Sequence, residues 1–230
     1  MTKWVSKGKC NLCGEEFAKA GMTRHITTCR KTHALEKLEG RGKPRDATLY
    51  HLVVEGGPAY WLHLEVPADA TLKNLDQFLR DIWVECCGHL SAFTIYGTRY
   101  DVDASMAREW GDEARSMNVA LAQVLQPGTK FGYEYDFGTT TELTLKVVSE
   151  REGQARGKSV QILARNDPPP IVCQSCGQPA TQVCTNCIWS GEGWLCDECA
   201  PDHSCGEEML LPVVNSPRVG MCGYTGGSYS

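Results

Sequence analysis

The sequence predicts an α+β protein, in which a central β-grasp-like sheet covered by a helix is flanked by small modules that zinc stabilises. Three observations lead to this fold class. Strand-like alternation of apolar and polar residues surrounds one strongly periodic helical stretch between residues 47 and 165. Cysteines with metal-ligand spacing gather at both ends of the chain. A stiff polar linker, "NDPPP" at 166–170, separates the middle of the chain from the last group of cysteines.

These observations divide the chain into five expected segments. They are a finger with a basic linker at 1–46, an α+β domain at 47–165, the proline linker at 166–170, a two-zinc module at 171–212 and a flexible tail at 213–230. A chain of 230 residues, 42% of them apolar, is long enough for one ordinary domain with such appendages.

The charge of the chain is unevenly distributed. The net charge of −5 excludes a generic nucleic-acid binder. Residues 1–46, however, hold eleven Lys and Arg against five Asp and Glu, a net charge of +6, and the other 184 residues carry −11. A basic head on an acidic body is often a contact for nucleic acid.

No targeting or membrane segment is expected. The first residues, "MTKWVSKGKC", lack the apolar stretch of a secretory signal, and no run of about 18 apolar residues occurs. We therefore expect a cytoplasmic protein without a membrane partner. Disulfides are disfavoured in the cytoplasm, so the thirteen cysteines need another explanation.

The first cysteines read "CNLCGEEFAKAGMTRHITTC", a C-x2-C pair followed by an H-x3-C pair. The second pair places both ligands on one helix face, one turn apart, as tetrahedral zinc requires. With Phe17 four residues after the second cysteine and Met22 three before the histidine, the stretch resembles the two-Cys-two-His zinc-finger family. It departs from that family in its cysteine as last ligand and in a loop one residue short. The expected ligands are Cys10, Cys13, His25 and Cys29, with His33 as a spare candidate for the fourth; the alternative is incidental thiols beside a surface histidine.

The elements of the central domain follow in order. Residues 47–56 and 59–67 alternate around "GGP" and predict a hairpin. Residues 70–87 place apolar side chains at helical spacing over four turns. A short strand at 92–97, an acidic solvated insertion at 101–115, a short helix at 119–125, a second hairpin at 130–138 and 142–149, and a last strand at 158–164 complete the domain.

The last cysteines form three C-x2-C pairs followed by H-x-C, which supplies eight donors for two tetrahedral sites. Used sequentially, the first two pairs bind one ion and the last two the other. In a cross-brace, pairs one and three share an ion, and so do pairs two and four. Loops of seven and eight residues favour the cross-brace. The expected ligands are Cys173, Cys176, Cys184, Cys187, Cys196, Cys199, His203 and Cys205.

Zinc is favoured here over the other uses of cysteine. A redox dithiol needs one C-x-x-C beside a βαβ pattern, and a disulfide framework needs an oxidising compartment. Because protein donors fill every position, the sites are expected to be structural, not catalytic, and three zinc ions per chain are expected. The spacing of this segment also resembles the B-box zinc-finger family, a cross-braced interaction module, although Cys176 stands where a B-box usually has His.

Residues 47–170 resemble a known family. The stretches "YHLVV", "YWLHLEVPADATLKNLDQFLRDIW", "YGTRY", "LQPGTKFGYEYDFG" and "ILARNDPPP" are similar to those of the plasmid pRiA ORF-three-like family, as is the tail "LPVVNSPRVGMCGYTG". The resemblance implies a fold and a prokaryotic or mobile-element setting, and it implies no reaction. This chain departs from the family after "HL" and after "YDFG", where polar residues of the family pattern are missing.

Two further groups of residues offer a functional and a structural interpretation. His89 could meet Asp136 or Tyr133, and Cys86 or Cys87 with His89 could form a nucleophile and base; a packed helix end is favoured instead. The aromatic residues of "FGYEYDFG" share one face of a strand and could stack bases, but core packing is favoured. Those aromatic residues are Phe131, Tyr133, Tyr135 and Phe137.

The function expected is therefore a non-enzymatic zinc-binding interaction or regulatory protein that contacts DNA or RNA through its basic finger. The candidate contacts with nucleic acid are Lys19, Arg24, Arg30 and Lys31. A protein–protein adaptor without nucleic-acid binding is the alternative, and an enzyme with a site in the central domain is a third. The oligomeric state is not predicted.

Overall fold

The computed structural model describes residues 4–35, 38–105 and 114–228. The chain divides into two compact units. The first, here the sheet unit, comprises Met1–Phe78 and Leu90–Asp167; the second, the tail unit, comprises Leu79–His89 and Pro168–Ser230. The tail unit thus contains a short segment from the middle of the chain as well as its C-terminal part.

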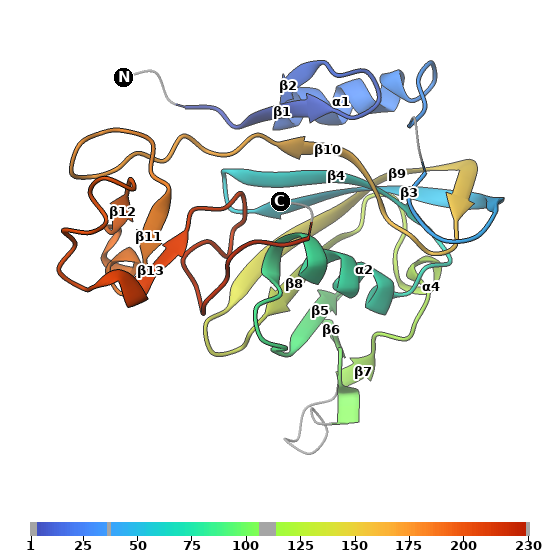
Figure 1. The fold of residues 1–230 in the computed structure, drawn as a ribbon. Helices are drawn as coiled ribbons and strands as arrows, with labels where there is room; N and C mark the ends of the chain where they lie inside the picture. The colour runs from blue at the N-terminus through green and yellow to red at the C-terminus, as the bar shows by residue number, and fades with distance from the viewer. Residues whose placement is uncertain (1–3, 36–37, 106–113, 229–230) are drawn as a thin grey trace. The chain divides into compact units, whose positions relative to one another are not determined.

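Within the described residues, ten strands form the sheet of the sheet unit, in the order β2-β1-β10-β4-β3-β9-β8-β5-β6-β7 (Figure 1). The pairs are antiparallel apart from β6 with β7. Its strands are β1 (Lys7–Cys10), β2 (Glu16–Ala18), β3 (Pro44–Gly56), β4 (Tyr60–Pro67), β5 (Ser91–Ile95), β6 (Thr98–Asp101), β7 (Ala114–Ser116), β8 (Lys130–Tyr135), β9 (Thr141–Arg156) and β10 (Gln161–Asn166). The two predicted hairpins are confirmed as β3–β4 and β8–β9, and the mixed α+β class is confirmed with them.

Two short strands, β6 and β7, were not predicted. The solvated insertion is expected at 101–115. Strand β6 ends at its first residue, and β7 begins at its second-to-last residue. Residues 106–113 between them lie outside the described residues. Their shortness and the intervening polar residues hide any alternation in the sequence.

The helix α2 (Leu72–Leu79) continues directly into a π-helix, η1 (Arg80–Val84). Thr71 and Asn74 begin the helix: the Asn74 N–H donates to Thr71 Oγ1 at 3.2 Å, and the Thr71 N–H donates to Asn74 Oδ1 at 3.0 Å. The apolar face predicted from the sequence is buried from Leu72 to Trp83, and Cys86 at its end is half-buried. A second short helix, α4 (Leu121–Val124), lies where the sequence predicts one.

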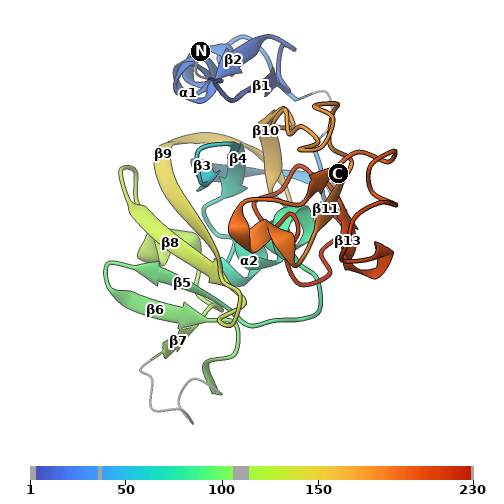
Figure 2. The same cartoon turned by 90° about the vertical axis from the view of Figure 1, so that its left-hand side faces the viewer.

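The N-terminal finger is a ββα unit of β1, β2 and α1 (Lys19–Cys29). Its strand β1 pairs with β10 in the register Gly8↔Asn166, so the finger hairpin extends the central sheet. Helices α1 and α2 lie on opposite faces of this sheet (Figures 1 and 2). The backbones of β1 and β10 approach so closely at Gly8 that a Cβ there would overlap the Arg165 carbonyl.

The core of the finger is continuous with the sheet. Met22 and Ile26 of α1 are fully buried and belong to one apolar cluster with Trp61 of β4 and Leu163 of β10. The finger therefore packs on the sheet through the apolar face of its helix.

A smaller sheet, in the order β12-β11-β13, organises the C-terminal part of the tail unit. Its strands are β11 (Gln182–Cys184), β12 (Trp194–Leu195) and β13 (Leu210–Pro212), and the 3₁₀ helices η2 (Cys187–Ser190) and η3 (Glu207–Met209) lie beside it in the chain. These strands are short and hold few apolar residues, so the apolar cluster beside them is small. Its buried members are Cys173, Leu195, Cys196 and Ala200.

None of the helices in the described part of the chain is long and apolar enough to cross a membrane.

Candidate metal centres

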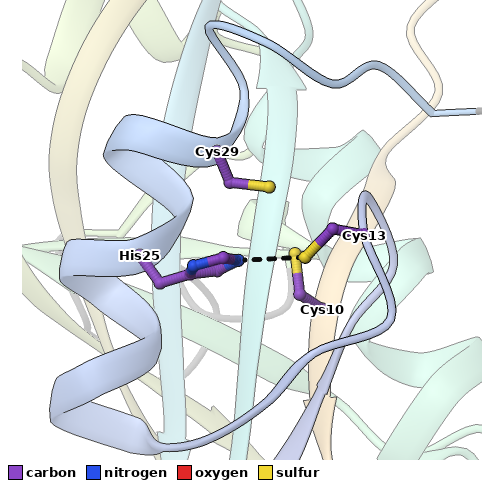
Figure 3. Close-up of side chains that lie close together, drawn as sticks. All are labelled: Cys10, Cys13, His25 and Cys29. Atoms are coloured by element: carbon purple, nitrogen blue, oxygen red, sulfur yellow. Dashed lines mark hydrogen bonds between the residues drawn. The ribbon is translucent and has the colours of Figure 1, made fainter.

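The finger brings together four donor atoms from two elements. Cys10 ends β1, Cys13 lies in the turn after it, and His25 and Cys29 lie four residues apart on α1. Their donor atoms all lie within 4.8 Å of one another, and Cys13 Sγ is 3.2 Å from His25 Nε2. Figure 3 shows the three sulfur atoms and the imidazole edge pointing toward one common point. This is the donor set predicted from the sequence.

The local structure explains how these donors are placed. The Gly14 N–H donates to the Cys10 carbonyl at 2.7 Å, and Gly14 adopts a φ of +80°, which closes the turn that carries Cys13. Phe17 stacks on the His25 ring at 4.2 Å between centroids and fixes its orientation. Met22, the second framework residue expected of a ββα finger, is fully buried.

His33, the spare candidate, lies outside the four-donor group. Its Nδ1 is 3.6 Å from Cys29 Sγ but only 2.9 Å from Thr32 Oγ1. His33 therefore lies beside the four-donor group, and His25 supplies its imidazole nitrogen.

Residues 173–205 of the tail unit hold two four-donor groups that use the cysteine pairs alternately. One joins Cys173 and Cys176 with Cys196 and Cys199; the other joins the pair at 184 and 187 with the donors at 203 and 205. In the first group, Cys176 Sγ is 3.5 Å from Cys196 Sγ. In the second, Cys187 Sγ is 3.5 Å from His203 Nε2 and 3.6 Å from Cys205 Sγ. Pairs one and three, and pairs two and four, therefore share a site, which is the cross-brace arrangement.

Backbone N–H groups donate to the first sulfur of pairs one and two, Cys173 and Cys184. Burial raises the pKa of Cys173, but N–H groups of Cys196, Cys176 and Ser175 lower it to about 6. Burial likewise raises the pKa of Cys184, and the N–H groups of Cys187 and Asn186 bring it below its usual value. Backbone N–H groups two and three residues after a cysteine stabilise its thiolate by hydrogen bonding. The thiolate is the form of cysteine that binds metal.

The finger shows the same amide pattern under stronger burial. The N–H groups of Leu12 and Cys13 donate to Cys10, yet desolvation by burial is the larger effect and leaves the pKa of Cys10 raised. Burial also raises the pKa of Cys29, to about 12, with the neighbouring thiols adding to the shift. Without a cation these thiols stay protonated at neutral pH, so metal binding there must release protons.

A fourth group of donors was not predicted. Cys86, Cys87, His89 and Cys222 also place one donor atom each within 4.8 Å of the others. Adjacent cysteines do not have knuckle spacing, and Cys222 lies 135 residues after Cys87, so no local pattern links them. The sequence indicates this group only through the number of its cysteines. The three predicted sites use ten of the thirteen and leave these three without a role.

The candidate nucleic-acid contacts divide into two groups. Arg24 and Lys31 are exposed. The Lys19 ammonium pairs with Glu55 at 2.8 Å. The guanidinium of Arg30 is buried, donates to Ser149 Oγ at 2.7 Å and lies 3.7 Å from Glu65, which also accepts two hydrogen bonds from Arg151.

The residues considered as a catalytic group, His89, Asp136 and Tyr133, each have different partners. His89 Nε2 lies 3.0 Å from Cys87 Sγ and 3.3 Å from Cys222 Sγ. Asp136 is buried, and its Oδ1 accepts hydrogen bonds from the backbone N–H groups of Gly138 and Thr139. Tyr133 donates to the buried carboxylate of Asp76, which also accepts from Ser91.

The aromatic row is mostly core. Phe131, Tyr133 and Tyr135 are buried, which confirms the packing interpretation for them. Phe137 lies beyond the end of β8, is 44% exposed and packs under the guanidinium of Arg99 at 4.6 Å.

Comparisons with known proteins complete the description. No curated protein matches the chain. A solved structure of a protein of unknown function from Methanosarcina mazei Go1 is 17% identical, covers 57% of this chain and 75% of its own, and superposes with a TM-score of 0.43. Residues 52–177, more than half of the chain, match the family described as plasmid pRiA4b ORF-3-like protein, and the chain belongs to that family.

Proposed function

We propose that this chain is a non-enzymatic binding protein whose predicted metal centres are structural zinc sites. The observation that carries the proposal is that each of the three predicted centres gathers four protein donors, three or four of them cysteine. Thiolate and imidazole are the donors that zinc prefers, and four of them leave no open position for a substrate or an activated water.

Metal analysis of the purified full chain tests this proposal. We expect zinc in the wild type and the loss of one ion per chain in each of Cys13→Ser, Cys176→Ser and Cys187→Ser, because each change removes one donor from a different centre. Ser175→Ala, a neighbour of the ligands that offers no donor to a centre, is the matched control and should keep every ion. A wild-type protein without zinc would refute the proposal.

For the partner, we propose the phosphate backbone of a nucleic acid, contacted by the finger without sequence readout. Arg24 and Lys31 are exposed on and just after α1, and Lys9 is exposed on β1. In a ββα finger the residue before the helix and the third and sixth residues face the bases. Here these positions hold Ala18, Gly21 and Arg24, so a single side chain can reach a base edge. Contact limited to phosphates depends on ionic strength and not on sequence.

A salt series with duplex DNA and with RNA tests this partner. We expect affinity to fall steeply with salt, and the double variant Arg24→Ala/Lys31→Ala to flatten the slope of log affinity against log salt by about 2. The control is Arg115→Ala/Lys146→Ala, which removes the same charge from exposed positions on β7 and β9. Absent binding at low salt, or an equal effect of both double variants, would remove this partner.

A protein partner is the second candidate, and Trp189 favours it. This side chain is 65% exposed on η2, two residues after the ligand Cys187. Exposed tryptophans are strongly enriched among the residues that dominate binding energies at protein interfaces. A protein captured by the wild type and by Arg24→Ala/Lys31→Ala, but lost with Trp189→Ala at unchanged zinc content, would identify the chain as an adaptor.

A further inference from the structure

We propose that Cys86, Cys87, His89 and Cys222 form a fourth zinc centre, which fastens the C-terminal tail to the loop that follows η1. All four residues belong to the tail unit, and each offers one donor atom to the group. The inference goes beyond the proposed function, because neither the finger nor the cross-brace uses any of these residues.

The distances resemble those of the three predicted centres. Cys87 Sγ lies 3.4 Å from Cys86 Sγ, 3.0 Å from His89 Nε2 and 3.7 Å from Cys222 Sγ, and His89 Nε2 lies 3.3 Å from Cys222 Sγ. In the predicted centres, four pairs of donor atoms lie 3.2–3.6 Å apart. Ligand distances of about 2.3 Å to sulfur and 2.0 Å to nitrogen give a zinc tetrahedron with edges of about 3.5–3.8 Å.

The cysteine inventory agrees with a fourth centre. The chain has thirteen cysteines, and all thirteen fall into the four groups, three in each group that includes a histidine and four in the other. Every group therefore contains four donors and leaves no thiol over. The three predicted centres take up ten of the thirteen cysteines, and the fourth group takes up the other three.

The loop that carries three of the donors is held in shape by buried charge. Arg80, which is buried, pairs with the Glu85 carboxylate at 2.6 Å and donates to the His89 carbonyl at 2.7 Å. Glu85 accepts a hydrogen bond from the Gly88 N–H at 2.6 Å, and Gly88 adopts a φ of +77°. The loop is thus shaped by contacts that do not use the donors, so its donors are preorganised.

The tail is positioned to deliver Cys222. Ser216 Oγ donates to the Trp83 carbonyl at 2.6 Å, and the Ser228 N–H donates to the Asp81 carbonyl at 2.7 Å. Gly227 lies so close to the helix end that a Cβ would lie 2.6 Å from the Ile82 carbonyl oxygen. Cys222 itself has a φ of +47° and lies between these two anchors.

The buried guanidinium of Arg218 lies beside this group of donors. Arg218 is fully buried, and its Nη2 lies 3.4 Å from Cys86 Sγ. Three thiolates and one Zn²⁺ carry one net negative charge, which the guanidinium balances. A cation in this position favours the thiolate form of the ligand, and such outer contacts commonly support metal sites.

Zinc content and variants of the full chain test the fourth centre. We expect four ions per chain in the wild type and three in Cys222→Ser and in His89→Ala. His89→Cys restores four donors and should restore the fourth ion. Ser216→Ala removes a tail anchor without removing a donor, and should keep all four. With cobalt in place of zinc, the sulfur-to-metal charge-transfer band should be weaker in Cys222→Ser than in Ser216→Ala.

Trypsin provides a second readout that does not depend on metal counting. Because Arg218 is buried in the tail, cleavage after it should be slow in the wild type and fast in Cys222→Ser or after chelation. A wild type with three ions that Cys222→Ser leaves unchanged would overturn the fourth centre alone. So would a Cys87–Cys222 disulfide in protein purified with reductant present, seen as the loss of two hydrogens in its mass. A wild type without zinc would instead overturn the proposed function.

Discussion

His51 of β3 and His63 of β4 lie side by side on the face of the sheet that the finger covers, and both are fully buried. His51 Nε2 is 2.9 Å from His63 Nδ1, while His51 Nδ1 and His63 Nε2 find no hydrogen-bond partner in the described part of the chain. Burial lowers the pKa of each histidine to about 3, helped at His51 by His63 and Arg30 and at His63 by Lys19. Both imidazoles are therefore neutral in the folded protein.

This pair predicts a loss of stability in acid. The pKa of each histidine is lower in the folded than in the unfolded chain, so protons bind the unfolded chain first. The contribution of the pair is complete above a pH of about 6.5 and falls by about 1.4 kcal/mol per pH unit and histidine as the pH drops toward 3. Urea unfolding between pH 7.5 and pH 4.5 should give a flatter profile for His51→Gln/His63→Gln than for the wild type. Zinc ligands titrate equally in both proteins, so parallel profiles would refute this origin.

Replacing Arg30 or Arg24 by alanine is expected to have opposite effects on stability and on nucleic-acid affinity. Arg30 is buried against Glu65 and Ser149, so Arg30→Ala should lower the free energy of unfolding by about 1–3 kcal/mol while the folded protein keeps its nucleic-acid affinity. Arg24 is exposed, so Arg24→Ala should leave stability unchanged and weaken binding. Thermal melts and a binding titration at one salt concentration check both, and a loss of affinity with Arg30→Ala at full stability would contradict the assignment.

At the scale of elements, the pairing of β1 with β10 decides whether the finger is separate or attached. Gly8 is the point of closest approach, and a side chain there meets the Arg165 carbonyl. Gly8→Ala should therefore separate the strands and raise amide hydrogen exchange across β1 and β10. Gly132→Ala on β8 is the matched control, because a Cβ there meets no atom within 4 Å. Equal exchange in the two variants would show that the pairing does not hold the finger.

The sequence predicted most of these elements because they leave strong local signals. The β3–β4 hairpin, α2 and the finger donors follow from period-two alternation, helical spacing and knuckle spacing. The burial of His51, His63 and Glu65 does not follow, because their alternation with apolar residues indicates a solvated face. The finger covers that face, and a long-range packing partner leaves no trace in local periodicity. The fourth donor group could not be predicted for the same reason, because Cys222 is far from the other three residues in sequence.

At the scale of the whole molecule, metal should matter unequally to the two units. In its described residues the sheet unit has ten strands and many buried apolar side chains, whereas the apolar cluster of the C-terminal part of the tail unit includes two of its own candidate metal donors, Cys173 and Cys196. Chelation should therefore raise hydrogen exchange throughout residues 171–212 while strands β3, β4 and β9 stay protected. Mass-spectrometric exchange with and without chelator checks this expectation, and a collapse of both units together would contradict it.

The contacts of Ser216 with Trp83 and of Ser228 with Asp81 also bear on how the chain is made. Residues 79–89 leave the ribosome well before residues 213–228, so this part of the fold stays open until the later segment has been made. A product truncated by premature termination would keep its central sheet and still present an uncovered helix end and two unmatched thiols, Cys86 and Cys87. Quality-control proteases recognise such uncovered segments. Residues 213–228 thereby decide whether a newly made chain exposes the end of η1 to such proteases.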